Sequence, residues 1–333
     1  MRLALLLLLG AAALASSAAA QTASHALTVE AVPVPLGFTD PTLDHAGLLA
    51  YRGGLLLSSA DRDFGGWSGM VVSPDGNRVV LISDVGSWLT ATLERRDGKV
   101  TGLGGATLAP LVGEDGRPLG SDKEMADAES LAEYPDGSLA IGFEHRHRVL
   151  HYPVSADGRP PLLNRPSRID APPGVAAADP NQGLEAMTVM PDGALLAFDE
   201  YLPDGLGHDI GWVFARPGGA PIRTLKLDLT DEFKPTDIKV LPNGDYLLLQ
   251  RRFSAVAGAG ARLSVVSAAA VAGDAPIADR ELGQITNEMT VDNFECLGVW
   301  RDTQGKTRAI VVSDDNFSVL QRTLLLEFEL PAE

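Results

Sequence analysis

The sequence has a single cysteine, Cys296, among its 333 residues. Disulfides within the chain are therefore excluded, and a secreted protein of this size must rely on its apolar core. Calcium can also stabilise such a fold, because its oxygen ligands need no thiol. No basic partner for Cys296 is evident in the sequence, so we expect a buried structural thiol.

Basic residues and aromatic residues are both scarce. The chain has 27 Lys and Arg residues against 44 Asp and Glu residues, which gives a formal charge of −17, and only 6% of its residues are aromatic. A nucleic-acid-binding protein usually has the opposite charge balance, and single-strand binders need aromatic stacking platforms. The composition excludes nucleic acid as a partner and favours cation binding.

Long apolar runs are absent after the first twenty residues. These residues, MRLALLLLLGAAALASSAAA, combine one positive charge, an apolar run and small residues before Gln21. This pattern predicts a secretory signal peptide over 1–20, cleaved after Ala20; the alternative is an uncleaved membrane anchor. We expect a periplasmic or secreted protein whose mature chain, 21–333, has no membrane span and is a monomer.

Two common hydrolase motifs are also missing. The stretch GWSGM around Ser68 lacks the second spacing of a Gly-x-Ser-x-Gly elbow, and there is no His-Glu-x-x-His sequence. These absences argue against a serine hydrolase of the elbow type and against a zinc protease.

Internal repeats are the strongest fold signal in the chain. A pair of short apolar runs joined by a Pro-Asp-Gly or similar turn occurs several times, and the turn prolines at 74, 135, 191 and 242 are spaced by 61, 56 and 51 residues. Such a unit accommodates a hairpin and two outer strands. The five predicted hairpins cover 68–84, 129–145, 184–200, 236–252 and 295–315.

Four-stranded units repeated in this way are typical of an all-β fold, the β-propeller. We predict six blades in one domain, with the sixth formed by residues 27–60, where LLAYRGGLLLSS resembles another hairpin. In this arrangement the N-terminal segment closes the ring against the C-terminal strands. The alternative is a β-sandwich with similar turns by chance.

Propeller geometry predicts where the acidic residues at the hairpin ends gather. The first strand of each blade lines the central channel, so its start and the end of the second strand lie at the channel end opposite the turn. Glu129, Glu185 and Glu295 share one register position at the start of first strands. Second strands close with Asp84, Glu144, Asp199, Glu200, Asp314 and Asp315.

Converging carboxylates repel one another unless cations or protons intervene. Oxygen ligands at a wide mouth suit Ca²⁺ better than Zn²⁺. We therefore predict Ca²⁺ as the cofactor, with these residues as candidate ligands: Glu129, Glu185, Glu295, Asp84, Asp199 and Asp314. The alternative is that the acids are solvated loop ends. Side chains alternate along a strand, so not every closing acid can face the channel.

Basic residues interrupt this pattern in two places. The fourth hairpin closes with Gln250, Arg251 and Arg252, and the stretch EHRHRVLH begins at Glu144. We expect Arg251, together with Arg252 or His145, to bind an anionic substrate, because an arginine fork matches phosphate geometry. The alternative for His145 is an ordinary surface position.

The repeats resemble the phytase-like family, described as esterase-like activity of phytase. The resemblance is carried by FGGWSGMVVSPDG (64–76), DAESLAEYPDGSLAIGFE (127–144), NQGLEAMTVMPDGALLAFDE (181–200), LLLQRRF (247–253), DNFECLGVW (292–300) and VVSDDNF (311–317). It implies a secreted or periplasmic propeller that hydrolyses phosphate or other esters. Cys296 departs from an expected glycine, and His145 and Gln250 replace parts of an expected Glu-Arg pair.

The leading functional hypothesis is a metal-dependent hydrolase acting on a small anionic or ester substrate. Glu129, Glu185 and Glu295 are its candidate catalytic residues, and a carboxylate outside the metal shell would act as general base. A lactonase-like propeller would use the same mouth on a neutral ester. A second hypothesis is a non-catalytic propeller that binds or scaffolds a partner.

Overall fold

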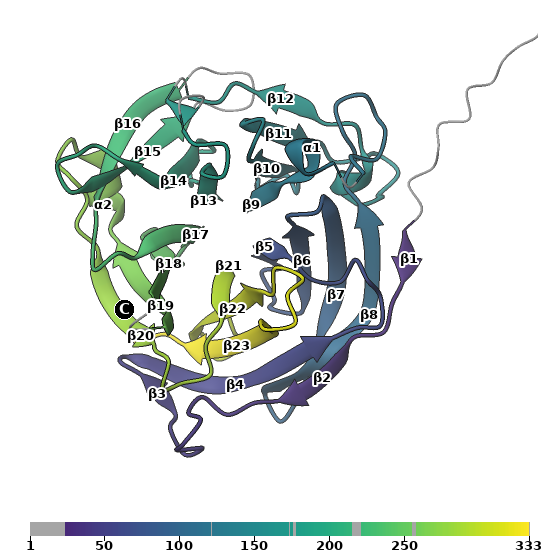
Figure 1. The fold of residues 1–333 in the computed structure, drawn as a ribbon, viewed down its shortest axis with the longest axis vertical. Helices are drawn as coiled ribbons and strands as arrows, with labels where there is room; N and C mark the ends of the chain where they lie inside the picture. Colours follow the sequence, from purple (N-terminus) through teal and green to yellow (C-terminus); the bar gives the residue numbers. More distant parts are fainter. Residues whose placement is uncertain are drawn as a thin grey trace, which may run out of the picture.

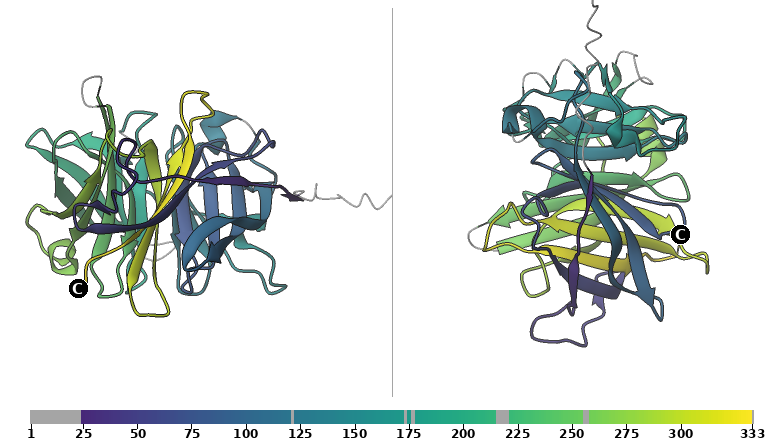
Figure 2. Two further views of the ribbon diagram at one scale, coloured as in Figure 1. Left: turned by 90° about the horizontal axis from the view of Figure 1, so that it is seen from below. Right: turned by 90° about the vertical axis from the view of Figure 1, so that its right-hand side faces the viewer.

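Five antiparallel sheets surround a central channel in the computed structural model of the protein (Figure 1). The structure describes residues 24–120, 122–172, 174–175, 178–214, 221–254 and 258–332. The predicted signal peptide, 1–20, lies outside these residues. Within the described residues, no helix is both long enough and apolar enough to cross a membrane. Figure 2 shows the ring edge-on, with connecting loops on both of its faces.

Each sheet is one blade, and its strands run in chain order outward from the channel, except that strands from the N-terminal segment form the outer edges of the first and fifth blades. The first blade contains β5 (Trp67–Val72), β6 (Arg78–Ser83), β7 (Ser87–Arg96) and β8 (Lys99–Pro110), with β1 (His25–Ala26) at its outer edge. The second contains β9 (Ala128–Glu133), β10 (Leu139–Phe143), β11 (Arg148–Tyr152) and β12 (Ser167–Ile169). The third contains β13 (Leu184–Val189), β14 (Leu195–Pro203), β15 (His208–Phe214) and β16 (Pro221–Asp228).

The last two blades complete the ring. The fourth contains β17 (Lys234–Val240), β18 (Tyr246–Ser254), β19 (Gly258–Val266) and β20 (Arg280–Ile285). The fifth contains β21 (Asn293–Arg301), β22 (Thr307–Asp314), β23 (Thr323–Glu329), β4 (Leu49–Ser58) and β2 (Glu30–Pro33), with β3 (His45–Ala46) paired to β4. Two short helices, α1 (Lys123–Ala126) and α2 (Ala268–Ala272), lie in connections. All five predicted hairpins are confirmed as the inner strand pairs.

The prediction of six blades is wrong: the propeller has five. Residues 49–58 form the single strand β4 rather than a hairpin, and this strand pairs with β23 of the fifth blade. Gly53 and Gly54 suggested a turn, but Gly54 is required by close packing. A Cβ atom at Gly54 would lie 2.5 Å from Leu326 Cδ2. The N-terminal segment therefore closes the ring from outside, as Figure 1 shows for β4 beside β23.

The apolar core lies between neighbouring blades, where the faces of adjacent sheets meet. One cluster joins the fifth blade to the first through Leu55, Trp67, Met70, Cys296 and Leu325, all essentially inaccessible to solvent. The prediction of a buried thiol is confirmed, and burial raises the pKa of Cys296 well above its usual value.

We predict that ring closure by β4 contributes measurably to stability. Leu55→Ala removes a fully buried side chain opposite Leu325, and it should lower the free energy of unfolding by about 2–5 kcal/mol. Leu48→Ala, at a position that is 55% exposed just before β4, is the matched control and should change it by less than about 0.5 kcal/mol. Chemical denaturation measures both, and equal effects would show that β4 is not part of the cooperative unit.

Candidate functional site

A β-bulge recurs at the same position of every inner strand. In each blade the pairing between the first two strands skips one residue of the inner strand. The five skipped residues are Ser68, Glu129, Glu185, Thr236 and Glu295. A bulge redirects the side chain of the extra residue, so these five residues occupy equivalent positions in their blades. Three of them are the glutamates predicted from the sequence.

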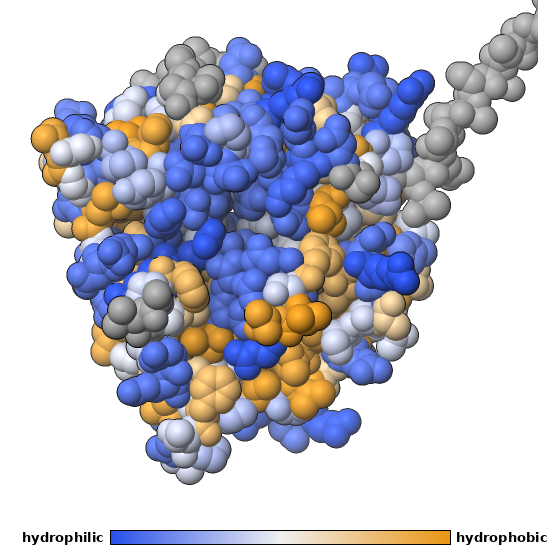
Figure 3. Space-filling view, in the orientation of Figure 1, coloured by the Kyte–Doolittle hydropathy of each residue, from blue (hydrophilic) through white to orange (hydrophobic). Residues whose placement is uncertain are grey.

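A second ring of equivalent positions follows from the same register. The residue two positions before each bulge pairs with a residue near the mouth end of the second strand, which we call the closing residue. In the second blade, for example, Glu144 N donates to Asp127 O over 2.9 Å. The five closing residues are Asp84, Glu144, Glu200, Arg251 and Asp314. This end of the channel, the acidic mouth, therefore has four acids and one arginine in its second ring. Hydrophilic side chains gather around the centre of the ring in Figure 3.

Arg251 connects carboxylates from two neighbouring blades. Its Nη2 lies 2.9 Å from Glu200 Oε1 and 4.0 Å from Glu185 Oε1, and its Nε lies 3.2 Å from Glu295 Oε1. Burial alone would lower the pKa of Arg251, but these glutamates outweigh it and raise the pKa. Burial raises the pKa of Glu295 to about 7 although Arg251 opposes this shift. The Arg251 guanidinium thus offsets part of the negative charge of the glutamates on the third and fifth blades.

Lys123 and His145 contact acids in another part of the mouth. Lys123 Nζ, on α1, lies 3.4 Å from Asp84 Oδ2 and 3.5 Å from Asp127 Oδ1. His145 Nε2 lies 3.0 Å from Asp127 Oδ2, and its backbone has the left-handed φ of 51°. His145 therefore contacts the Asp127 carboxylate from the adjacent turn, and its side chain is 24% exposed.

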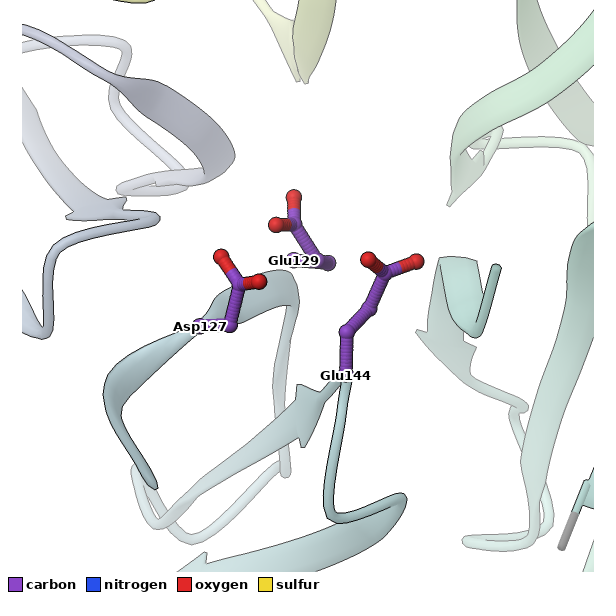
Figure 4. A group of neighbouring side chains, drawn as sticks. All are labelled: Asp127, Glu129 and Glu144. Carbon is purple, nitrogen blue, oxygen red and sulfur yellow. The ribbon is translucent and has the colours of Figure 1, made fainter. Parts of the chain in front are cut away.

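Three carboxylates of the second blade lie close enough to bind one cation. Ligand oxygens of Asp127, Glu129 and Glu144 all lie within 4.8 Å of one another, and Figure 4 shows their carboxylates turned toward a common space. Asp127 Oδ1 and Glu144 Oε1 are buried and have no hydrogen-bond partner in the described part of the chain. Burial, and then Asp127, raise the pKa of Glu144 to about 8. An all-oxygen donor set with unsatisfied buried atoms fits Ca²⁺.

The other predicted metal ligands lie in different settings. Glu185 and Glu295 contact Arg251, and Asp84 contacts Lys123. Asp199 is fully buried one residue before the closing ring; burial raises its pKa to about 7, and Asp209 on β15 adds to the shift. Asp314 accepts a hydrogen bond from the backbone N–H of Asn316 over 2.6 Å, and burial followed by Glu295 raises its pKa to about 9.

The predicted substrate-binding arginines differ in surroundings. Arg251 contacts the carboxylates described above. Arg252 lies one residue further along β18, in a cleft beside the mouth, with its guanidinium carbon 4.6 Å from the centre of the Phe233 ring.

A lysine spans the channel below the acidic mouth. Lys239 Nζ on the fourth blade donates to Leu131 O on the second blade over 3.1 Å. Leu131 is two residues beyond Glu129 on β9, so this contact marks a floor beneath the glutamates. Lys239 also pairs with Asp237, whose Oδ2 accepts from Leu297 N over 2.7 Å and ties the fourth blade to the fifth.

Asp127 and Glu144 are not among the candidate cation ligands predicted from the sequence, and Lys123 and Lys239 are not predicted as counter-charges. The signal for Asp127 is its place two residues before the bulge glutamate in DAES, which is the position that pairs with Glu144. Lys123 lies four residues before Asp127 and Lys239 lies two residues after Asp237, so part of each pairing is local. Their contacts with Asp84 and with Leu131 O carry no comparable signal, because these partners are distant in the sequence.

We predict that Arg251→Gln destabilises the fold at neutral pH when a chelator is present. The substitution leaves Glu185, Glu200 and Glu295 without their shared cation, and removing one partner of a buried ion pair costs about 3–5 kcal/mol. Arg159→Gln, which removes an exposed pair with Asp157, is the control and should cost less than about 1 kcal/mol. Urea unfolding measures both, and similar values for the two variants would contradict the role assigned to Arg251.

The raised pKa of Asp314 predicts a direction for the pH dependence of stability. The folded state holds this proton up to a pKa of about 9, whereas the unfolded chain releases it near about 4. Without divalent cations, the free energy of unfolding should therefore fall as the pH rises from about 5 to about 9. Asp314→Asn should make this slope shallower.

The control for this slope is Asp75→Asn. Hydrogen bonds from Ser73 and Asn77 lower the pKa of Asp75 to about 2, so its titration lies outside the window. Denaturant unfolding at a series of pH values gives all three slopes. A wild-type stability that rises over this range would contradict the assignment.

Comparisons with known proteins complete the description of the site. No curated protein sequence is similar enough to count as a match. Similar solved structures include an endo-arabinase from Bacteroides thetaiotaomicron (TM-score 0.48, 11% identity, covering 82% of this chain and 96% of that one). A protein of unknown function from Dyadobacter fermentans has TM-score 0.44 and 14% identity, covering 92% and 95%. A putative gluconolactonase has TM-score 0.43 and 11% identity, covering 92% and 94%.

The sequence match to a family is more specific. The model of one family, Phytase-like, matches residues 62–317, which include all five inner hairpins and every residue of both rings at the mouth. The chain therefore belongs to the Phytase-like family, described as esterase-like activity of phytase.

Proposed function

We propose that this protein is a secreted or periplasmic, Ca²⁺-dependent hydrolase of phosphate or other esters. The observation that carries the proposal is the division of charge at the acidic mouth. Arg251 contacts Glu185, Glu200 and Glu295, whereas Asp127, Glu129 and Glu144 form a group with unsatisfied buried oxygens. The mouth thus offers a cation site and a fixed guanidinium on opposite sides of one channel.

Asp127, Glu129 and Glu144 are the residues that would hold the ion. A bound Ca²⁺ supplies Lewis acidity toward an ester oxygen and lowers the pKa of a nearby water. Asp127 is held on its other side by His145 over 3.0 Å, a contact that fixes the carboxylate before any ligand arrives. A positive charge there would offset the loss of solvation of Glu129 and Glu144 and their repulsion by neighbouring carboxylates, both of which raise the pKa values of these residues.

Arg251 is suited to hold the anionic part of a substrate. Its Nε and Nη2 are fixed by carboxylates from two blades, so the guanidinium loses little freedom when a phosphate or an ester oxygen approaches. Its positive charge is also permanent at any working pH. In this proposal Glu185 and Glu200 are positioning residues that act through Arg251.

Glu295 is the residue best placed for proton transfer. Burial raises its pKa to about 7, close to the value at which a general base works most efficiently at neutral pH. In the reaction, the oxygen of water bonds to phosphorus or to the carbonyl carbon, and the proton of that water passes to Glu295. The bond to the leaving oxygen breaks, and this oxygen takes the proton from Glu295.

We predict that Ca²⁺ stabilises the folded protein. Binding to the folded state alone adds about 2.7 kcal/mol at a hundredfold excess over Kd. Glu144→Gln should reduce this gain, because it removes one carboxylate charge from the group with little change in shape. Glu124→Gln, an exposed acid on α1 close by in the chain, is the matched control and should keep the full response. Thermal unfolding with calcium and with chelator measures the effect.

The outcomes of that experiment are distinct. A melting temperature that does not respond to calcium would contradict the cation site. A response that persists in Glu144→Gln would place the ion elsewhere.

We also predict turnover of an ester that depends on calcium. A panel of a phosphate monoester, a carboxylate ester and a lactone, assayed with calcium and with chelator, identifies the reactive class. Glu295→Gln should lower kcat by about 10²–10⁴, because it removes the proton acceptor. Calcium binding without turnover of any of the three would contradict the hydrolase and leave the non-catalytic binding alternative.

A further inference from the structure

A cleft on the outer side of the mouth, between the third and fourth blades, is not used by the proposed reaction. Its volume is about 490 Å³, and its lining includes Tyr201, Phe233, Lys234, Arg251, Arg252 and Phe253. Tyr201 follows the closing residue Glu200, and Phe253 lies two residues after the closing residue Arg251. The cleft therefore begins where the mouth ends, with Arg251 as a residue common to both.

Aromatic side chains are concentrated in this cleft although the chain has few of them. Phe253 is 79% exposed and Tyr201 is 42% exposed, so both present ring surface to solvent at the end of adjacent blades. Phe233 is buried beneath them in the same lining. Exposed aromatic surface beside a polar site is a common feature of pockets that bind small ligands with an apolar body.

Two cations lie against these rings. Lys234 Nζ is 4.7 Å from the centre of the Tyr201 ring, and the Arg252 guanidinium carbon is 4.6 Å from the centre of the Phe233 ring. Arg252 Nε is buried and has no hydrogen-bond partner in the described part of the chain. Lys234 also lies 3.6 Å from Glu200 Oε1, and Glu232 contributes one acid to the lining.

Arg252 is the cation of this cleft that an anion can reach. The lining holds three cations, Lys234, Arg251 and Arg252, and one acid, Glu232. Arg251 and Lys234 both lie close to Glu200, whereas Arg252 is only partly buried and has no ion pair in the described part of the chain. The terminal nitrogens of its guanidinium can donate to an anion.

We propose that this cleft binds an aromatic ring with an anionic substituent, which forms the part of the ester that extends from the channel. The ring packs against Phe253 and Tyr201, and Arg252 binds its anionic group. The reacting ester group lies at the mouth between Arg251 and the Asp127, Glu129 and Glu144 group. The proposal rests on the proposed function for the position of the ester group, and it names the substrate class: anionic aryl esters.

Three phosphonates that cannot be hydrolysed test this inference by binding alone. Methylphosphonate, phenylphosphonate and 4-carboxyphenylphosphonate share the group expected at the mouth and differ only in what reaches the cleft. With calcium present, isothermal titration calorimetry should show the affinity rising in that order. Equal affinities for the three, or no binding, would overturn the proposal.

Two variants divide the contributions of ring and charge. Phe253→Ala should reduce the preference for phenylphosphonate over methylphosphonate by about fivefold to tenfold, because it removes the exposed ring. Arg252→Gln should reduce the preference for the carboxyphenyl over the phenyl compound by about tenfold. Leu206→Ala and Arg159→Gln are the controls, since both residues are exposed and lie outside the cleft. Preferences unchanged in the first two variants would overturn the proposal.

The same compounds as phosphate esters separate this inference from the proposed function. If the aryl phosphonates bind with the expected preferences but no aryl phosphate is turned over, the cleft is supported and the hydrolase fails. If esters are turned over without preference for the anionic aryl compound, the hydrolase stands and the cleft fails. Thermal unfolding of each variant checks that its fold is intact.

Discussion

Arg251 is the contact on which the arrangement of the acidic mouth depends. It lies 2.9 Å from Glu200 and 3.2 Å from Glu295, and these two residues belong to the blades on either side of its own. Like charges that converge from several strands raise one another's pKa values until a cation intervenes. The fourth blade supplies that cation in the register position where the other blades carry an acid. Neutralisation on this side leaves Asp127, Glu129 and Glu144 as the part of the mouth that an ion can fill.

The arrangement of the mouth depends on a backbone feature, the β-bulge in each inner strand. A bulge in each inner strand places five residues at equivalent positions around the mouth. A substitution at one of these positions can change the charge of the mouth without changing the strand pairing. Ser68 and Thr236 occupy two of these positions, and their hydroxyl groups donate hydrogen bonds to backbone carbonyl oxygens. Only the other three blades contribute a glutamate at this position. Lys239, anchored by Asp237, reaches across the channel beneath these glutamates. Lys239 thus places a cation beneath the acidic residues of the mouth.

The sequence predicts the hairpins well because each Pro-Asp-Gly or related turn is a local signal, and the five inner pairs are found where expected. The prediction of a hairpin at residues 49–58 was wrong because Arg52-Gly53-Gly54 resembles a turn sequence. In the structure, Gly54 is required because β4 packs closely against Leu326. The shared register of Glu129, Glu185 and Glu295 is found in the structure, where all three occupy the bulge position of their inner strands. The alternation of side chains along a strand does not reveal the bulges. The sequence therefore did not distinguish Asp199 from the closing residues such as Glu200. Lys123 also contacts Asp84, and Lys239 contacts Leu131 O; both of these partners are distant in the sequence, and only the tertiary structure shows the contacts.

The central claim is that the cation site lies on the second blade, opposite Arg251. The most direct measurement is a crystal soaked in Sr²⁺, which replaces Ca²⁺ at oxygen sites and can be located by its anomalous scattering. The account predicts one strong peak at coordination distance, about 2.3–2.6 Å for calcium and slightly longer for strontium, from oxygens of Asp127, Glu129 and Glu144. Arg251 should keep its contacts with Glu200 and Glu295. A peak between Glu185 and Glu295 with Arg251 displaced, or no peak in the mouth, would contradict it.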